Sequence, residues 1–76
     1  MRTTPSLRYA IETDRHGITM RLIGEWLDLA AYYEGSDGNA WSFNACTGGW
    51  SNCGPVADFR ANFAQRYRGA LFPVAA

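Results

Sequence analysis

One stretch decides the fold of this chain: residues 55–69, which read PVADFRANFAQRYRG. Pro55 suits the first turn of a helix, because the N–H that it lacks has no intrahelical partner there. The apolar residues that follow recur at intervals of three and four and so share one face of a helix. They are Val56, Phe59, Phe63 and Tyr67. The stretch predicts an amphipathic helix that begins near Pro55, ends near Gly69 and packs on another element.

The runs upstream of this helix predict strands. Residues 7–12 and 18–23 each alternate apolar and polar side chains, which is the period of a half-buried strand. The four residues 14–17 between them are typical of a hairpin loop, and closing it places Ile11 opposite Met20. The apolar side chains of both strands then point to one face. We expect the helix to cover that face.

Residues 25–34 are ambiguous. Their leucine, alanine and glutamate favour a helix by propensity. A type II′ turn at Gly24 and Glu25 would instead start a third strand and place Arg21 opposite Asp28. Turn chemistry, burial and charge pairing agree on the strand, so we favour it. The alternative is a short helix over 25–34, which would give the order ββαβα.

The turn signal at residues 36–39 contains Asp-Gly and predicts a fourth strand over 40–46. Strict two-residue closure of this turn places Tyr32 opposite Phe43, whereas a bulge or a longer loop shifts Phe43 under the helix. The glycine-rich residues 47–54 are interpreted as a connection. The expected fold is α+β: a three- to four-stranded antiparallel meander with one C-terminal amphipathic helix packed on one face.

Size and charge limit the possible functions. Seventy-six residues allow a single compact α+β domain, residues 1–76, with 47% hydrophobic residues for its core. Seven basic and seven acidic residues give a net charge of zero, which disfavours direct binding to nucleic acid or to an anionic membrane. No apolar run approaches the roughly 20 residues that span a bilayer. We expect no membrane contact and a cytoplasmic location in a bacterial host cell.

The chain offers little for catalysis or for cofactors. His16 is the one histidine and falls in a predicted turn, and the spacing of Cys46 and Cys53 is not that of a structural zinc site. Residues 47–49 lack the lysine of a phosphate-binding loop. We therefore expect no enzyme activity, no cofactor and no metal. A disulfide between Cys46 and Cys53 is possible from their spacing, with two free thiols as the alternative in a reducing cytoplasm.

The outer face of the predicted sheet is the candidate site. If the helix covers the other face, a set of tryptophan, tyrosine and arginine side chains stays exposed, and these residue types are enriched at binding hot spots. The predicted partner-binding residues are Arg8, Arg21, Trp26, Asp28, Tyr32, Trp41 and Trp50. The alternative is that they fill a second small core or a homodimer interface.

These observations suggest a non-catalytic module that binds a larger bacterial protein or protein–nucleic-acid complex, as a monomer or a homodimer. Short chains without motifs are typical of phage- or mobile-element-encoded inhibitors of host assemblies, including anti-CRISPR proteins, which act by occluding a surface. This expectation rests on size and on missing motifs, and no residue carries a family signature. The alternatives are a single-stranded nucleic-acid binder that stacks bases on sheet aromatics, with Arg8 and Arg21 on phosphates, or a homodimeric antitoxin-like or structural protein.

Overall fold

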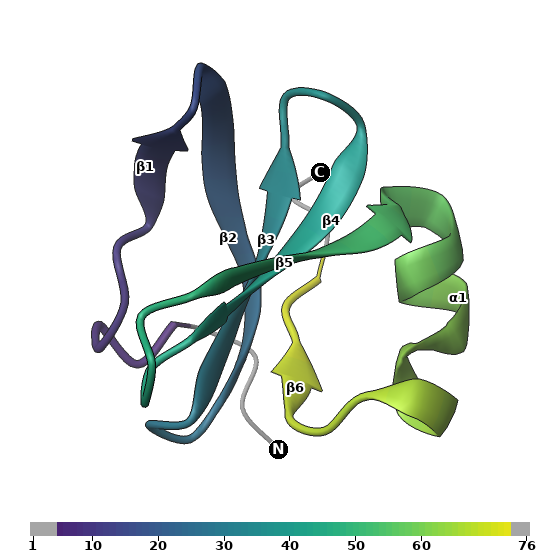
Figure 1. The fold of residues 1–76 in the computed structure, drawn as a ribbon. Helices are drawn as coiled ribbons and strands as arrows, with labels where there is room; N and C mark the ends of the chain where they lie inside the picture. The colour runs from purple at the N-terminus through teal and green to yellow at the C-terminus, as the bar shows by residue number, and fades with distance from the viewer. Residues whose placement is uncertain (1–4, 74–76) are drawn as a thin grey trace.

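The computed structural model describes residues 5–73 and is an antiparallel sheet with one helix packed on it (Figure 1). This confirms the α+β class, and the sheet has more strands than expected. The elements are β1 (Glu12–Arg15), β2 (Ile18–Trp26), β3 (Ala30–Gly35), β4 (Asn39–Asn44), β5 (Trp50–Pro55), α1 (Val56–Arg66) and β6 (Ala70–Leu71). Strands β1 to β5 form a meander in sequence order, and β6 returns to pair with β2.

Strand β2 organises the sheet. It pairs with β3 along one edge, while β1 and β6 share its other edge. The first half of β2 pairs with β1, and Gly24 and Glu25 pair with β6. A β-bulge between Leu22 and Gly24 separates the two halves. Such a bulge bends its strand, so the two ends of β2 can follow different partners.

The predicted helix is confirmed. It begins after Pro55, and its residues Phe59 and Phe63 are buried. They pack on Ile23, Tyr32 and Ala40 of the sheet in what we call the helix-side core. The ring of Tyr32 lies 5.6 Å from that of Phe59 and 5.2 Å from that of Phe63. Aromatic contacts at this separation add to the burial of apolar area and hold α1 against the sheet.

The end of the helix differs from expectation. The backbone of Tyr67 is already extended, so α1 ends at Arg66 and Gly69 does not cap it. Gly69 has φ of 111° and lies close to the backbone of Glu25. A Cβ atom added at this position would lie 2.4 Å from the Glu25 carbonyl oxygen. Glycine is required at this position by the approach of the chain to β2, where β6 begins.

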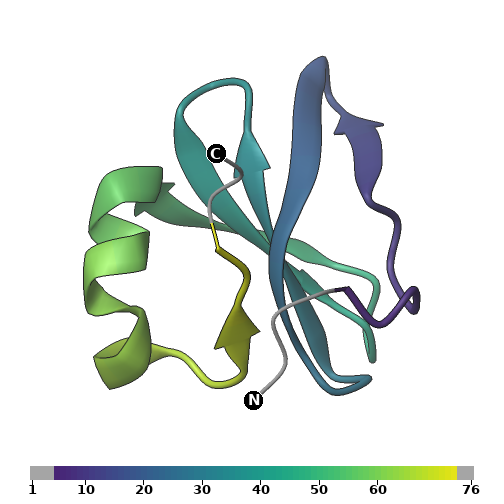
Figure 2. The same ribbon diagram turned by 180° about the vertical axis from the view of Figure 1, so that it is seen from behind.

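The helix covers the opposite face of the sheet from the one we expected. Trp26 and Tyr32 were assigned to the exposed face, yet they belong to the helix-side core. The other face carries a second cluster, the outer-face core, built on Met20, Ala31 and Tyr33 and joined by Tyr9, Ile18, Leu22, Trp41, Phe43 and Trp50. Both faces are apolar, so alternation along the strands could not show which one the helix covers. Figures 1 and 2 show α1 on one side of the meander.

The predicted register of the first hairpin was wrong. The turn contains two residues, His16 and Gly17, which both have positive φ (52° and 79°), and not the four residues 14–17. Positive φ at both central residues is the geometry of a type I′ turn, which matches the twist of paired strands. Met20 therefore faces Thr13, two positions from the expected Ile11.

The predicted second turn was also wrong. Strand β2 continues through Gly24 and Glu25, and the chain reverses at residues 27–29. Arg21 faces Glu34 across the β2–β3 pair, and its Nε atom lies 3.7 Å from a carboxylate oxygen of Glu12. The expected pair of Arg21 with Asp28 therefore does not form. The alternative of a helix over 25–34 is wrong too, because these residues belong to β2, a turn and β3.

The last strands were only partly foreseen. Strand β4 overlaps the predicted range of 40–46 but begins at Asn39 and ends at Asn44. Phe43 faces Ala31 and not Tyr32, so the register is shifted from that of strict two-residue closure. The shift places Phe43 in the outer-face core and not under the helix. Strand β5 had been interpreted as a connection, since serine, asparagine and glycine are poor strand formers. Pairing with β4 overrides that weak propensity.

Candidate functional site

Three leucines are exposed at one end of the sheet. Leu7, Leu27 and Leu29 have 83%, 63% and 40% of their surface exposed. The guanidinium of Arg8 forms an ion pair of 3.1 Å with Asp28, which lies between two of the leucines in the β2–β3 turn. In Figures 1 and 2 the segment before β1 and this turn lie at the same end. We call Leu7, Leu27, Leu29 and the Arg8–Asp28 pair the leucine end.

Two of these leucines have an unfavourable backbone conformation. Leu7 has φ of 70° and Leu27 has φ of 50°. The left-handed region costs a residue with a side chain about 1–2 kcal/mol. Burial of the side chains does not offset this cost, because both are exposed. Neither packing nor backbone preference within residues 5–73 accounts for leucine at these two positions.

The outer-face core is aromatic and partly open. Tyr9, Tyr33, Phe43 and Trp50 line a cavity on this face. The ring of Trp50 lies 5.1 Å from those of both Tyr33 and Phe43. Burial raises the pKa of Tyr33 to about 12, and its hydroxyl donates a hydrogen bond of 2.8 Å to the carbonyl oxygen of Ala10. The segment before β1 is thereby attached to this face.

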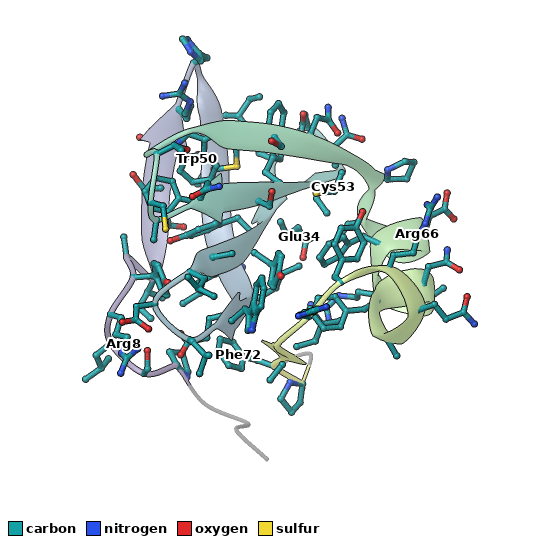
Figure 3. The ribbon with its side chains drawn as sticks, turned by 60° about the horizontal axis from the view of Figure 1, so that its bottom comes forward. Arg8, Glu34, Trp50, Cys53, Arg66 and Phe72 are labelled. Carbon is teal, nitrogen blue, oxygen red and sulfur yellow. The ribbon has the colours of Figure 1, made fainter. Side chains whose placement is uncertain are left out.

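The volume of this aromatic cavity is ≈ 260 Å³, and Arg8, Ala10 and Thr13 complete its lining; a separate, larger cavity of ≈ 450 Å³ is lined by other residues. Trp41, on the same face, donates a hydrogen bond of 3.3 Å from its Nε1 to Asp37. Figure 3 labels Trp50 on this face and Cys53 nearer the helix. The outer face therefore presents half-buried rings to solvent, with few charged groups among them.

The seven predicted site residues do not share one surface. Arg8 and Asp28 meet at the leucine end, and Trp41 and Trp50 belong to the outer-face core. Trp26 and Tyr32 pack in the helix-side core, so the expectation that they face solvent on the open side was wrong. Tyr32 is 4% exposed. Arg21 lies elsewhere, in the lining of the larger cavity. Whether any of the seven contacts a partner stays a prediction.

Sequence reasoning missed the leucine end. Leu7, Leu27 and Leu29 all fell inside predicted strands, whereas the observed turn at residues 27–29 places Leu27 and Leu29 at the tip of a hairpin. A signal was present in the Leu-Asp-Leu triplet at 27–29, which puts a charge between two apolar residues where two strand-like runs meet. Strand alternation explains the same triplet equally well, so the signal was not decisive.

The structure also places the residues considered for chemistry. Cys46 and Cys53 are free thiols, the first exposed and the second half-buried beside the helix-side core. His16 is exposed in the first turn. Within residues 5–73, no three histidine, cysteine or acidic side chains are grouped as a metal site would need. No helix in the same range has the length and apolar character to cross a membrane.

No protein-family model, curated protein or solved structure matches this chain. The functional argument therefore depends on the geometry of the surface and on the chemistry of the residues that form it.

Proposed function

We propose that this protein is a non-catalytic protein-binding module whose contact surface is the leucine end. The observation that supports the proposal most directly is the pair of exposed leucines at positive φ, Leu7 and Leu27. Unfavourable backbone conformations persist where the surrounding structure holds them, and they concentrate at functional sites. A partner that buries both side chains would supply the stabilisation that the free chain lacks.

The surface has the composition of a small interface. Its apolar side chains come from two segments, and the Arg8–Asp28 ion pair lies between them. Exposed apolar patches with polar surroundings mark interaction sites in soluble proteins. The hydroxyl of Tyr9 donates a hydrogen bond of 2.9 Å to the carbonyl oxygen of Leu27, which holds the two segments together before any partner arrives. Preorganisation of this kind lowers the entropy lost on binding.

The particular form that we propose is an inhibitor of a bacterial host assembly, encoded by a phage or a mobile element and acting by occlusion in the manner of anti-CRISPR proteins. The support is the short chain, its zero net charge and its lack of catalytic motifs. The partner would be a larger bacterial protein or protein–nucleic-acid complex in the cytoplasm.

The test starts with capture from a bacterial lysate on immobilised protein, followed by reconstitution of each captured protein as a purified pair. Leu27→Ser combined with Leu29→Ser should weaken the pair at least about tenfold, since burial of a leucine side chain contributes about 1.5–3 kcal/mol. Gln65→Ser on the exposed surface of α1 is the matched control and should bind as the unsubstituted chain does. A pair that binds the double variant undiminished would contradict the proposed surface.

A second candidate is single-stranded nucleic-acid binding on the outer face. The half-buried rings of Trp41, Phe43 and Trp50 favour it, because bases stack on such rings. Arg8 and Arg21, the cations expected to meet phosphates, each lie beside a carboxylate and are partly neutralised. A fluorescence titration of the tryptophans with oligothymidylate at low salt tests this function. Saturable quenching that Trp50→Leu removes would establish it.

A further inference from the structure

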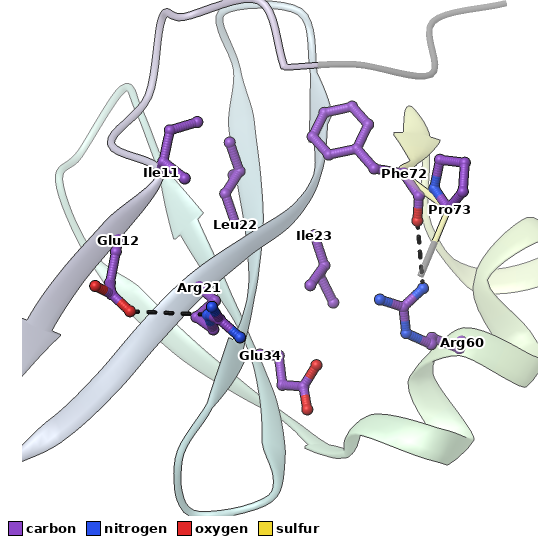
Figure 4. A pocket seen from close by; sticks show the side chains of 9 residues that line it. All are labelled: Ile11, Glu12, Arg21, Leu22, Ile23, Glu34, Arg60, Phe72 and Pro73. Carbon is purple, nitrogen blue, oxygen red and sulfur yellow. Dashed lines mark hydrogen bonds and ion pairs between the residues drawn. The ribbon is translucent and has the colours of Figure 1, made fainter. Parts of the chain in front are cut away.

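A cavity lies where β1 and β6 separate along the edge of β2 (Figure 4). It encloses ≈ 450 Å³, within the range of about 300–1,000 Å³ that is usual for small-molecule sites. Its apolar wall contains Ile11, Leu22, Ile23 and Phe72. It shares no lining residue with the leucine end, so the proposal below goes beyond the proposed function.

Four charged side chains also line the cavity, and two of them are already paired. The Nε atom of Arg21 lies 3.7 Å from a carboxylate oxygen of Glu12, so these two charges offset each other. Arg60 of α1 uses one N–H, at 3.5 Å from the carbonyl oxygen of Phe72. The carboxylate of Glu34 in β3 makes no hydrogen bond and no ion pair with any group in residues 5–73. Among the residues that the structure describes, one cation and one anion thus remain available to a ligand.

The two available charges belong to different elements of the same cavity. In Figure 4 the guanidinium of Arg60 points from the helix toward the strands, and Ile23 lies between the backbones that carry Arg60 and Glu34. Since the lining contains two arginines and two glutamates, a ligand of net charge would be attracted by one pair and repelled by the other. A ligand with both charges and an apolar body fits this arrangement.

We propose that this cavity binds a free α-amino acid with an apolar side chain. The carboxylate of the amino acid would accept two hydrogen bonds from N–H groups of Arg60, in the bidentate geometry that guanidinium groups favour. Its ammonium group would donate to the carboxylate of Glu34, and its side chain would contact Leu22 and Phe72. Each part of the ligand then meets a group of matching chemistry.

The test is an NMR titration of the full chain with L-leucine and L-phenylalanine, following the backbone amides of Ile23 and Phe72. Saturable shifts with a Kd on the order of 1 mM are expected, since the cavity is open and each charged contact is partly solvated. N-acetyl-L-leucine and L-leucinamide each lack one of the two charges. Both should bind at least about fivefold more weakly than L-leucine.

Substitutions locate the binding. Arg60→Gln and Glu34→Gln should each weaken binding of L-leucine at least about fivefold. Arg60→Lys keeps the positive charge but loses the bidentate geometry of the guanidinium group. Its affinity for L-leucine should lie between those of Arg60→Gln and the unsubstituted chain. Arg66→Gln, outside the cavity lining in the last turn of α1, is the control and should bind normally.

The proposal is wrong if neither amino acid gives a saturable shift, if the blocked forms bind as well as L-leucine, or if Arg60→Gln and Glu34→Gln bind normally. The folding of each variant is checked by its amide spectrum, and the Arg60→Lys result decides the matter should Arg60→Gln not fold. Loss of partner binding in the leucine variants would leave amino-acid binding unchanged. The failures of the two proposals are thereby distinguishable.

Discussion

The hydroxyl of Tyr9 donates a hydrogen bond of 2.9 Å to the carbonyl oxygen of Leu27, a residue with φ of 50°. This bond and the Arg8–Asp28 ion pair attach the segment before β1 to the β2–β3 turn. The turn is therefore held from outside in a conformation that leucine disfavours. The same contacts bring Leu7, the other leucine with positive φ, to the same end of the sheet.

Leu27→Asn is expected to raise stability while it lowers partner binding. Asparagine tolerates the left-handed region better than leucine does, so the free energy of unfolding should increase by about 0.5–1 kcal/mol. For a chain of this size the midpoint of thermal unfolding should rise by a few degrees, at about 4–8 °C per kcal/mol. Leu29→Asn is the control, because Leu29 is not among the residues with positive φ. Equal thermal midpoints for Leu27→Asn and Leu29→Asn would contradict the argument from strain.

Gly69→Ala is expected to detach β6 from β2. A Cβ at this position would lie 2.4 Å from the carbonyl oxygen of Glu25 and 2.8 Å from the Cβ of Trp26, and φ is 111°. The chain must shift to relieve these contacts, so the Phe72 amide, which donates to the Ile23 carbonyl oxygen at 2.7 Å, should exchange faster with solvent. Hydrogen exchange measures this directly.

The matched control for that substitution is Gly48→Ala. Gly48 also has positive φ, 75°, but nothing lies within 4 Å of its added Cβ. It therefore shares the backbone cost without the steric contact. Unchanged protection of Phe72 in Gly69→Ala would show that β6 does not depend on the close approach.

Phe59→Ala is expected to unfold much of the population. Phe59 is 2% exposed and contacts the rings of Tyr32, Phe63 and Tyr67. Truncation of a buried phenylalanine costs about 3–5 kcal/mol, which is most of the stability of a domain this small. Phe59→Leu should cost less, because it leaves a smaller cavity. Urea denaturation of both variants gives the two free energies, and a loss below about 1 kcal/mol for Phe59→Ala would contradict this account of the core.

Stability is expected to fall above pH 10. Burial raises the pKa of Tyr33 to about 12, above the ordinary value of about 10, and it also raises the pKa of Tyr32. A raised folded-state pKa means that the folded chain binds the phenol proton more tightly than the unfolded chain. The stability that this tighter proton binding contributes is present in full below about pH 10 and is lost as the pH rises toward 12.

Urea midpoints measured across this alkaline range test that prediction. Tyr33→Phe should reduce the fall with pH, because phenylalanine has no proton to lose. A spectrophotometric titration should show tyrosine ionisation delayed beyond the ordinary value of about 10. Tyrosines that all ionise near 10, or a variant with the same alkaline fall, would contradict the role of burial.

The sequence by itself determined the helix and the nature of the sheet. The spacing of Phe59, Phe63 and Tyr67 after Pro55 is a local pattern, and the helix depends on local hydrogen bonds. The alternation over residues 18–23 likewise predicted strand β2, because side chains on a strand alternate whatever its neighbours are. The turn signal at residues 36–39 was local in the same way and marked the β3–β4 reversal.

Only the tertiary structure decided which strands pair, in which register, and which face the helix covers. The bulge between Leu22 and Gly24 shifts the alternation along β2, so that Leu22 and Trp26, which an unbroken strand would place on one face, belong to different cores. Strand β5 exists because β4 offers it hydrogen bonds, although its own residues are poor strand formers. These pairings place Leu27 at an exposed hairpin tip instead of in the core. The candidate surface follows from contacts between distant residues, which no local pattern encodes.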